Sequence, residues 1–563
     1  MNKFFLYIGI SMVLFSCTNQ PGNIISFDFK EVYSGIEFDM PGVALPAFPE
    51  YSVSITDFGA IPDGETLNTE AIAKAIDHVN EKGGGKVIIP RGLWMTGPII
   101  LKSNVNLHTE QGALVIFSTN FDLYPIIETS FEGLNTFRCL SPIYAKDVEN
   151  IAITGKGIFD GSGDAWRPVK KSKLTESQWN KLIHSGGILN ESKTTWYPTQ
   201  QALDGIKNSN MNVPDLKTKE EHEKIKDFLR PVMISIVNSK RILLDGVGFQ
   251  NSPAWCLHPL MCEDIIISNL IIRNPWYSQN GDGLDLESCK NVIIYNCNFD
   301  VGDDGICFKS GKNKDGRDRG MPNENVIVKN CIVYHGHGGF VIGSEMSGGM
   351  RNIHVSNCTF IGTDIGLRFK STRGRGGIIE NIYISNIDMI DILAEAIRFN
   401  MFYGGNSPIP EPEQTVVNKE ELAKLMPPVS EETPVFRKIY INNVVCRGAR
   451  RAIQLEGLPE MNLETVVIKN IDITADQGFD AKEVNNIQIE NVNLVVKKGP
   501  VVELKNAKNI HFKNLTYSSE NNSIVDIKGR LSENISFQKK DFTNVENQVS
   551  FQENLEKSIL ILE

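Results

Sequence analysis

The chain has 563 residues but only ten cysteines, and its positive charges do not outnumber its negative ones. Setting Cys17 aside leaves nine cysteines, an odd number too sparse for a disulfide-dense scaffold. No CxxC motif with a matching His or Cys pair indicates zinc, and we expect neither a metal nor a cofactor. The formal net charge of −11 disfavours nucleic acid as a partner, although it leaves room for a local basic cleft.

The N-terminus has the pattern of an export signal. Residues 1–16 carry one lysine and then an apolar run, which is shorter than the roughly 20 residues of a membrane span. The following Cys17 completes a sequence, LFSC, that resembles the lipobox of bacterial lipoproteins. We expect an exported protein, an outer-membrane lipoprotein or a periplasmic one, with the membrane contacted only through this lipid. A plain signal peptide with an incidental cysteine is the alternative.

A short pattern, apolar-x-apolar-x-Asn, recurs ten times and organises the rest of the chain. The first apolar residues of the copies are Ile242, Ile265, Val292, Val326, Ile353, Ile382, Ile439, Val466, Ile487 and Ile510. Alternating apolar residues predict strands, and steps of mostly 21–34 residues predict a stacked array. Because no convincing helical pattern separates the copies, the strands must stack on one another. The predicted fold class is therefore all-β, a parallel β-helix.

One position of the repeat predicts a ladder of side chains. The residue four after the first apolar position is asparagine in nine of the ten copies, and asparagine tolerates the left-handed conformation of a tight turn. Stacked at about 4.8 Å per rung, the amides can bond to one another. The next position is cysteine in Cys297, Cys331 and Cys358, which we interpret as a buried stack of small side chains.

The parts that lack the repeat define the domain organisation. Residues 69–81 have an amphipathic helical pattern and are expected to cap the N-terminal end of the array. We expect a signal peptide at 1–16, a linker at 17–50, a β-helix at 51–546 and a tail or cap at 547–563. Two polar insertions, near 166–230 and 406–433, are expected to decorate one face of the array, as binding loops often do.

Four polar motifs follow four consecutive copies of the repeat. They are Asn280-Gly281-Asp282, Gly302-Asp303-Asp304, His335-Gly336-His337-Gly338 and Arg368-Phe369-Lys370. Each alone is typical of a solvated turn or a strand edge. Four in order, at similar distances from the repeat, predict that their side chains meet on one face of neighbouring rungs. Such a face would span roughly 14 Å of an extended polymer.

These residue types fit hydrolysis of a glycosidic bond. Carboxyl groups held close together raise one another's pKa, so one can stay protonated as the acid while the others remain ionised as the base. Inverting hydrolysis uses carboxyl groups about 6.5–9.5 Å apart, with a water between them, and aspartates about a rung apart fit that gap. The cations Arg368 and Lys370, with the basic run 309–319, predict an anionic sugar.

The four motifs resemble those of glycoside hydrolase family 28, the polygalacturonases and their relatives. The resemblance covers about residues 51–403 and includes DFGAIPDG, PRGLWMTGPIILKSNVNLH and NSPAWCLHP. Two positions differ, because Gly281 stands where threonine is frequent and Phe369 where isoleucine is frequent. The resemblance implies a right-handed, single-stranded parallel β-helix, and a galacturonate-rich polysaccharide or oligosaccharide as the substrate of a monomer.

The resemblance also implies a role for each site residue. Asp303 would be the general acid, Asp282 and Asp304 would activate water, and His337 would tune the protonation of the acid. Arg368 and Lys370 would bind the galacturonate carboxylate, Asn280 would orient Asp282, and His258 and Tyr403 would contact the substrate. Because the insertion at 166–230 could wall off the groove, we expect an exo-acting polygalacturonase.

Three alternatives remain open at this stage. A rhamnogalacturonan-directed hydrolase would belong to the same family. A pectate lyase would use the same solenoid, with Ca²⁺ held by the aspartates. A non-enzymatic, polysaccharide-binding β-helix would explain the repeat but not the convergence of acids, histidine and cations.

Overall fold

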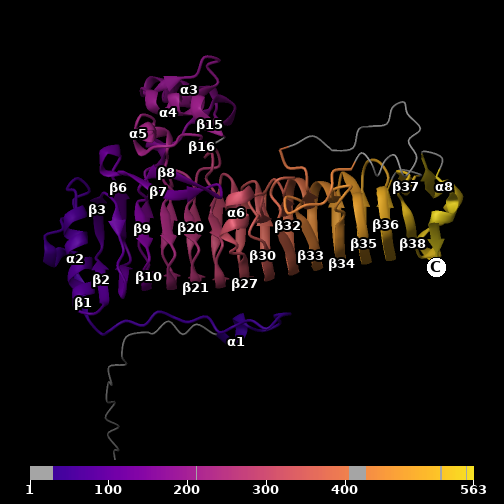
Figure 1. The fold of residues 1–563 in the computed structure, drawn as a ribbon, viewed down its shortest axis with the longest axis horizontal. Helices are drawn as coiled ribbons and strands as arrows, with labels where there is room; N and C mark the ends of the chain where they lie inside the picture. The colour runs from indigo at the N-terminus through magenta and orange to yellow at the C-terminus, as the bar shows by residue number, and fades with distance from the viewer. Residues whose placement is uncertain (1–28, 211, 405–425, 520–522, 553–554) are drawn as a thin grey trace, which may run out of the picture.

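The computed structural model describes residues 29–210, 212–404, 426–519, 523–552 and 555–563. Within these residues, 33 strands belong to one hydrogen-bonded sheet that winds along the chain as a parallel β-helix (Figure 1). The predicted fold class is thereby confirmed. The predicted signal peptide at 1–16 and Cys17 lie outside the described residues, as does most of the second insertion.

Each complete turn of the solenoid contributes strands to three faces. The site face consists of β4 (Ile99–Ile100), β9 (Ile143–Lys146), β17 (Ile234–Val237), β20 (Leu257–Leu260), β23 (Leu284–Glu287), β26 (Asp304–Lys309), β29 (Gly338–Ile342), β31 (Leu367–Lys370), β37 (Val525–Lys528) and β39 (Val549–Phe551). The repeat face consists of β1 (Ser52–Ser54), β2 (Gly85–Ile89), β5 (Val105–Thr109), β10 (Glu149–Gly155), β18 (Lys240–Asp245), β21 (Glu263–Ser268), β24 (Lys290–Tyr295), β27 (Asn323–Lys329), β38 (Glu533–Phe537) and β40 (Leu560–Leu562). The third face consists of β3 (Gly92–Thr96), β6 (Ala113–Phe117), β11 (Ile158–Asp160), β19 (Gly248–Gln250), β22 (Ile271–Arg273), β25 (Asn298–Val301) and β28 (Ile332–His335). Long strands run around the corners from face to face: β30 (Met350–Ile361), β32 (Ile378–Asn400), β33 (Val435–Glu456), β34 (Leu463–Ala475), β35 (Gln477–Val496) and β36 (Val502–Ser519).

The core lies inside the coil because alternate residues of every strand point inward. All ten first apolar residues of the repeat have no exposed surface. They stack in register, as in the pairing of Ile242 with Ile265 and of Ile265 with Val292. Fully burying a side chain of this size contributes about 1.5–3 kcal/mol, so each copy of the repeat stabilises its own rung of the solenoid.

The predicted asparagine ladder forms at one corner. Its members adopt positive φ angles near 55°, and Asn296, for example, donates to Asn269 at 2.6 Å. Sequence analysis missed a second ladder at the residue just before the first apolar position, where Asn325 donates to Asn291 at 3.2 Å. Both corners need a left-handed residue, and asparagine supplies it while its amide bonds to the neighbouring rung. Cys297, Cys331 and Cys358 are buried and free, as predicted.

Helices lie at the ends of the solenoid and in its loops. The predicted capping helix is present as α2 (Thr69–Glu81), which buries Ile72, Ile76 and Val79 at the N-terminal end (Figure 1). The other described helices are α1 (Phe29–Val32), α3 (Glu176–His184), α4 (Gln200–Gly205), α5 (Lys219–Glu223), α6 (Asn313–Arg319) and α8 (Val545–Gln548). Helix α6 was not predicted, because its basic run shows no apolar stripe. Among the described residues, no helix has the length and apolar character needed to cross a membrane.

The insertion at 166–230, hereafter the insertion lobe, stands above the solenoid near β20 (Figure 1). It contains α3 to α5 and two small antiparallel sheets, formed by β12 (Val169–Lys170), β13 (Ile188–Leu189) and β14 (Thr195–Tyr197), and by β15 (Ser209–Asn210) and β16 (Val213–Pro214). A hairpin of β7 (Ile126–Phe131) and β8 (Leu134–Cys139) lies at its base. In the segment 547–563, expected as a tail or cap, β39 and β40 pair with β37 and β38 and so extend the sheet.

Residues 29–50, expected as part of a linker, dock along the repeat face. Val32 and Val43 pack against Ile266, Ile293 and Ile327, which point outward from that face. A hydrogen bond reinforces the contact, with Oε2 of Glu37 lying 2.6 Å from Nδ1 of His354. The described part of the linker is therefore a strap that covers an apolar stripe.

Candidate active site

The structure brings the three predicted aspartates together, at the amino ends of two neighbouring site-face strands. Strand β23 pairs with β26 so that Leu284 faces Ile306, and the same offset places Asp282 beside Asp304. Asp282 and Asp304 are buried, and Asp303 is partly exposed. One oxygen from each lies within 4.8 Å of those of the other two. We call these three residues the acid cluster.

This spacing is shorter than sequence analysis expected. The nearest oxygens of the acid cluster are not separated by 6.5–9.5 Å, because adjacent strands stand only about 4.8 Å apart. The shorter gap still fits one water. A water that donates about 2.8 Å hydrogen bonds to two carboxylates can bridge oxygens up to roughly 5.6 Å apart.

Two cations from the next rungs hold Asp304. Nζ of Lys370 donates to Oδ2 of Asp304 at 2.6 Å, and Nη1 of Arg368 donates to Oδ1 at 3.0 Å. Burial alone would raise the pKa of Asp304, but the charges of Lys370, Arg368 and Lys309 outweigh it and hold that pKa well below its ordinary value. Asp304 is therefore the permanently ionised member of the acid cluster.

Asp282 has the opposite environment. Its Oδ1 is buried without a hydrogen-bond partner among the described residues. Burial, and then repulsion by Asp285, Asp303 and Asp304, raises its pKa well above the ordinary value. Asn280, predicted to orient Asp282, instead accepts a 2.9 Å hydrogen bond from Nη2 of Arg230.

Asp303 forms a pair with His337. Nδ1 of His337 lies 2.9 Å from Oδ1 of Asp303, and Nε2 faces Asp364 at 3.8 Å. The hydrogen bond to Asp303 outweighs desolvation and raises the pKa of His337. The two groups therefore share a proton that is retained to a higher pH than a free histidine would allow.

We predict that His337→Gln will move the alkaline limb of the pH–activity profile toward acid. In the wild type the hydrogen bond to Asp303 raises the pKa of His337, so the pair keeps its proton to a higher pH, and glutamine cannot carry that proton. The limb should shift by at least about one pH unit, measured as kcat/KM across pH. His335→Gln is the matched control, because His335 makes an equivalent 2.9 Å pair with Asp300 outside the acid cluster. A parallel shift in both variants would contradict the prediction.

The two remaining predicted contacts occupy different settings. Tyr403 is 37 % exposed, and its ring lies 5.1 Å from Nζ of Lys370 and 5.7 Å from Cζ of Arg368, so it borders the cations. His258 is buried, and its Nε2 bonds to Oε2 of Glu287 at 3.0 Å. A direct contact between His258 and the substrate stays a prediction.

Sequence analysis missed a buried charged group beside the acid cluster. Asp285 points outward from β23, and Nζ of Lys309 lies 3.5 Å from its Oδ1 and 3.1 Å from Oε2 of Glu345. Alternation along β23 places Asp285 between the inward Leu284 and Leu286, so its direction was readable in the sequence. The burial of Asp285 could not be read from the sequence, because segments distant in the sequence cover this part of the site face.

Arg230 is a second residue that sequence analysis missed. It ends the insertion lobe, is buried, and donates to the carbonyl oxygens of Pro253 at 2.9 Å and Gln279 at 3.0 Å, in addition to Asn280. The loop that leads to Asp282 is therefore fixed by the insertion lobe. A lone arginine at the end of a polar insertion carries no sequence signal of such a role.

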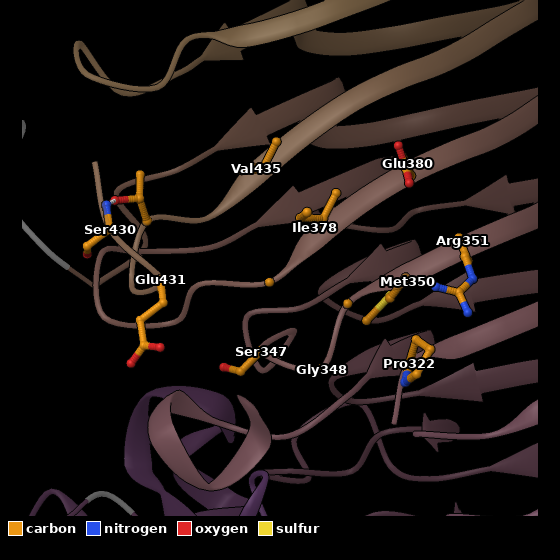
Figure 2. A pocket seen from close by; sticks show the side chains of 13 residues that line it. Pro322, Ser347, Gly348, Met350, Arg351, Ile378, Glu380, Ser430, Glu431 and Val435 are labelled. Carbon is orange, nitrogen blue, oxygen red and sulfur yellow. Dashed lines mark hydrogen bonds between the residues drawn. The ribbon is translucent and has the colours of Figure 1, made fainter. Parts of the chain in front are cut away.

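One hollow of the solenoid lies away from the acid cluster. It has a volume of about 450 Å³ and lies at the turn between the carboxyl ends of the site-face strands and the repeat face (Figure 2). The acid cluster lies at the opposite ends of those strands. Arg351 is the cation of the lining, whereas Glu380 and Glu431 are acidic, so the hollow is unsuited to an anionic sugar.

Comparison with known proteins finds two family models that match parts of this chain. Residues 201–425 match the family model "Glycosyl hydrolases family 28", and residues 52–123 match "Rhamnogalacturonase A/epimerase, pectate lyase-like". A "Probable polygalacturonase" of Vitis vinifera is 26 % identical over 75 % of this chain and 74 % of its own length. An exo-poly-alpha-D-galacturonosidase of Dickeya chrysanthemi is 29 % identical over 63 % of this chain and 58 % of its own length.

A solved structure is also similar to this chain. The crystal structure of a hyperthermoactive exopolygalacturonase from Thermotoga maritima has a TM-score of 0.61 and 29 % identity, covering 86 % of this chain and 93 % of that one. A parallel β-helix with carboxyl groups clustered beside cations on one face defines the class, a polysaccharide-cleaving glycosidase. The match to the model of glycoside hydrolase family 28 covers all of the predicted site residues, from His258 to Tyr403.

Proposed function

We propose that this protein is an exo-acting polygalacturonase that hydrolyses α-1,4-galacturonosidic bonds by an inverting single displacement. The observation that carries the proposal is the acid cluster itself. It combines a carboxyl group paired with a histidine, a carboxylate held ionised by two cations, and a third, buried carboxyl group within 4.8 Å. Exo-acting relatives at 29 % identity support the same activity.

Each member of the acid cluster takes one step of the reaction. Asp303 donates its proton to the leaving glycosidic oxygen, and His337 holds that proton until it is used. A water between Asp282 and Asp304 attacks the anomeric carbon on the side opposite the leaving oxygen. The proton of this water passes to one of these two carboxylates. Because the pKa of Asp282 is raised, the acid limb of activity should lie above the ordinary range of aspartate.

The cations and Tyr403 supply the substrate contacts. A galacturonate carboxylate that approaches Arg368 and Lys370 meets two donors already held in position by Asp304. Tyr403 is exposed beside them and offers a ring to the sugar. These contacts select an acidic unit next to the bond that is cleaved.

The insertion lobe supports exo action. It is anchored to the loop before Asp282 through Arg230, and a small hollow of about 110 Å³ remains between Arg230, Trp166 and Gln279. The insertion lobe therefore contacts the loop on the N-terminal side of the acid cluster, where it can close one end of a substrate groove. A wall there lets a chain end reach the acid cluster and keeps the middle of a polymer out.

The alternatives fit the site less well. A Ca²⁺-dependent lyase would need Asp304 as a metal ligand, but both of its oxygens are engaged by cations. The rhamnogalacturonase-like match covers residues 52–123 and so contains none of the predicted site residues. A binding protein has no need of the proton shared by Asp303 and His337.

Viscosity tests the mode of cleavage. We predict that reducing ends will accumulate on de-esterified polygalacturonate, in the presence of a chelator, while the viscosity of the solution stays nearly constant. The reason is that removing terminal units hardly shortens a long chain. An early fall in viscosity would contradict exo action, and unsaturated or chelator-sensitive products would indicate a lyase.

We propose further that the protein is a monomer tethered to a membrane through a lipid on Cys17. The LFSC sequence supports the tether, and Cys17 itself lies outside the described residues. Fractionation of cells that express the wild type or Cys17→Ser tests it. We expect the wild type in the membrane fraction and the variant in a soluble exported fraction, and identical fractionation would contradict the tether.

A further inference from the structure

Trp276 is unlike the other tryptophans of this chain. Its side chain is 54 % exposed, whereas Trp94, Trp166, Trp179, Trp196 and Trp255 are buried. Trp276 lies in the loop between β22 and β23, six residues before Asp282. Its indole is therefore open to contact from solvent, on the loop that leads to Asp282.

The loop that carries Trp276 is held firmly. Its neighbour Tyr277 packs against the apolar cluster of the insertion lobe formed by Val169, Trp179 and Trp196. Ser278 donates to the carbonyl of Pro275 from its backbone at 2.8 Å and from its hydroxyl at 2.6 Å. The indole is therefore presented on a fixed support.

The same loop touches the loop of the general acid. A Cβ atom on Gly302, the residue before Asp303, would lie 2.5 Å from the carbonyl oxygen of Pro275. The backbone N–H of Gly302 also donates to the carbonyl of Gly281 at 3.4 Å. The backbone next to Trp276 thus contacts the loop that carries Asp303, while Tyr277 packs on the insertion lobe.

A cation accompanies the indole. Nζ of Lys173, from the insertion lobe, lies 5.4 Å from the centre of the Trp276 ring. In the described part of the chain, Lys173 forms no ion pair, unlike Lys171, which lies 3.4 Å from Glu176. An aromatic face next to an uncompensated ammonium matches a pyranose ring with a carboxylate substituent.

We propose that Trp276 and Lys173 form a further sugar-binding subsite, which holds one galacturonate unit on the insertion-lobe side of the acid cluster. The sugar ring stacks on the indole, and its carboxylate pairs with Lys173. The insertion lobe then takes part in binding, in addition to limiting access. This inference rests on the proposed function, because it assumes a galacturonan substrate.

Chain length and charge test the subsite. On galacturonate oligomers long enough to reach it, Trp276→Ala and Lys173→Gln should each raise KM about tenfold and leave kcat little changed. On the shortest cleaved oligomer that does not reach it, both variants should match the wild type. Lys171→Gln is the matched control and should behave as wild type. On oligomers whose carboxyl groups are methyl-esterified, Lys173→Gln should lose its disadvantage.

A binding measurement separates failure of the subsite from failure of the proposed function. Oligogalacturonate should change the tryptophan fluorescence of Asp303→Asn, and adding Trp276→Phe should abolish most of that change. Normal KM values for Trp276→Ala and Lys173→Gln at every length, in an enzyme whose wild type cleaves galacturonan, would overturn the subsite alone. A wild type that neither cleaves nor binds galacturonan would overturn both.

Discussion

Asp303→Asn is expected to lower kcat on polygalacturonate about 10³-fold and to leave KM within about threefold of the wild type. Asparagine keeps the size of the side chain and a contact to His337, but it has no proton to give to the leaving oxygen. The substrate contacts at Arg368 and Lys370 are unchanged. Initial rates with defined oligogalacturonates measure both constants.

The chain supplies a matched control for this substitution. Asp300 pairs with His335 at the same 2.9 Å on the rung that carries Asp303, yet it lies on the third face in β25. Asp300→Asn should retain nearly full activity. If Asp303→Asn retained more than about a tenth of the wild-type kcat, Asp303 would not be the general acid.

Lys370→Met is expected to lower both activity and stability. Asp304 is 2 % exposed, and the substitution removes its 2.6 Å partner while Arg368 remains. Breaking a buried ion pair costs about 3–5 kcal/mol, so the urea midpoint at neutral pH should fall clearly. The rate should fall about 10²-fold or more. Asp304 loses a cation that keeps it ionised, and the galacturonate carboxylate loses a cation that binds it.

The destabilisation should depend on pH in a defined direction. The pKa of Asp304 is depressed in the folded state, so its ion pairs stabilise the fold above the unfolded pKa of about 3.9 and lose this effect as the pH falls through the folded pKa. The difference in urea midpoint between the wild type and Lys370→Met should therefore shrink below about pH 4. Equal differences at pH 7 and pH 3 would contradict this account.

Lys528→Met controls for the loss of any lysine from the site face. Lys528 lies 2.9 Å from Glu503 and 3.0 Å from Asp526, far along the solenoid from the acid cluster, and its side chain is 24 % exposed. Partly exposed ion pairs contribute only about 0–1 kcal/mol. The control should keep full activity and nearly full stability.

The fold could be predicted because the same local pattern recurs on every rung. Each copy of the repeat predicts the same buried position and the same corner asparagine. Ten copies that agree therefore predict a parallel stack. The strap at 29–50 has no repeat of its own. Its docking site was nevertheless visible, because Ile266, Ile293 and Ile327 are apolar at a position that should face water.

The sequence could predict which residues of the site lie close together, because that depends on their position along a rung. The acid cluster, His337, Arg368 and Lys370 meet because their motifs follow the repeat at similar distances. Which groups bond to one another depends on side-chain directions across several rungs, and the sequence does not record these. For this reason sequence analysis assigned Arg368 and Lys370 to the substrate alone, although they also hold Asp304.

The most direct test of the proposed activity is the first product released from a galacturonate oligomer of defined length. We predict that the wild type, with chelator present, releases small terminal units from the start, and that Asp303→Asn at equal folding releases none. An early ladder of intermediate oligomers, or equal release by Asp303→Asn, would contradict an exo-acting hydrolase whose acid is Asp303.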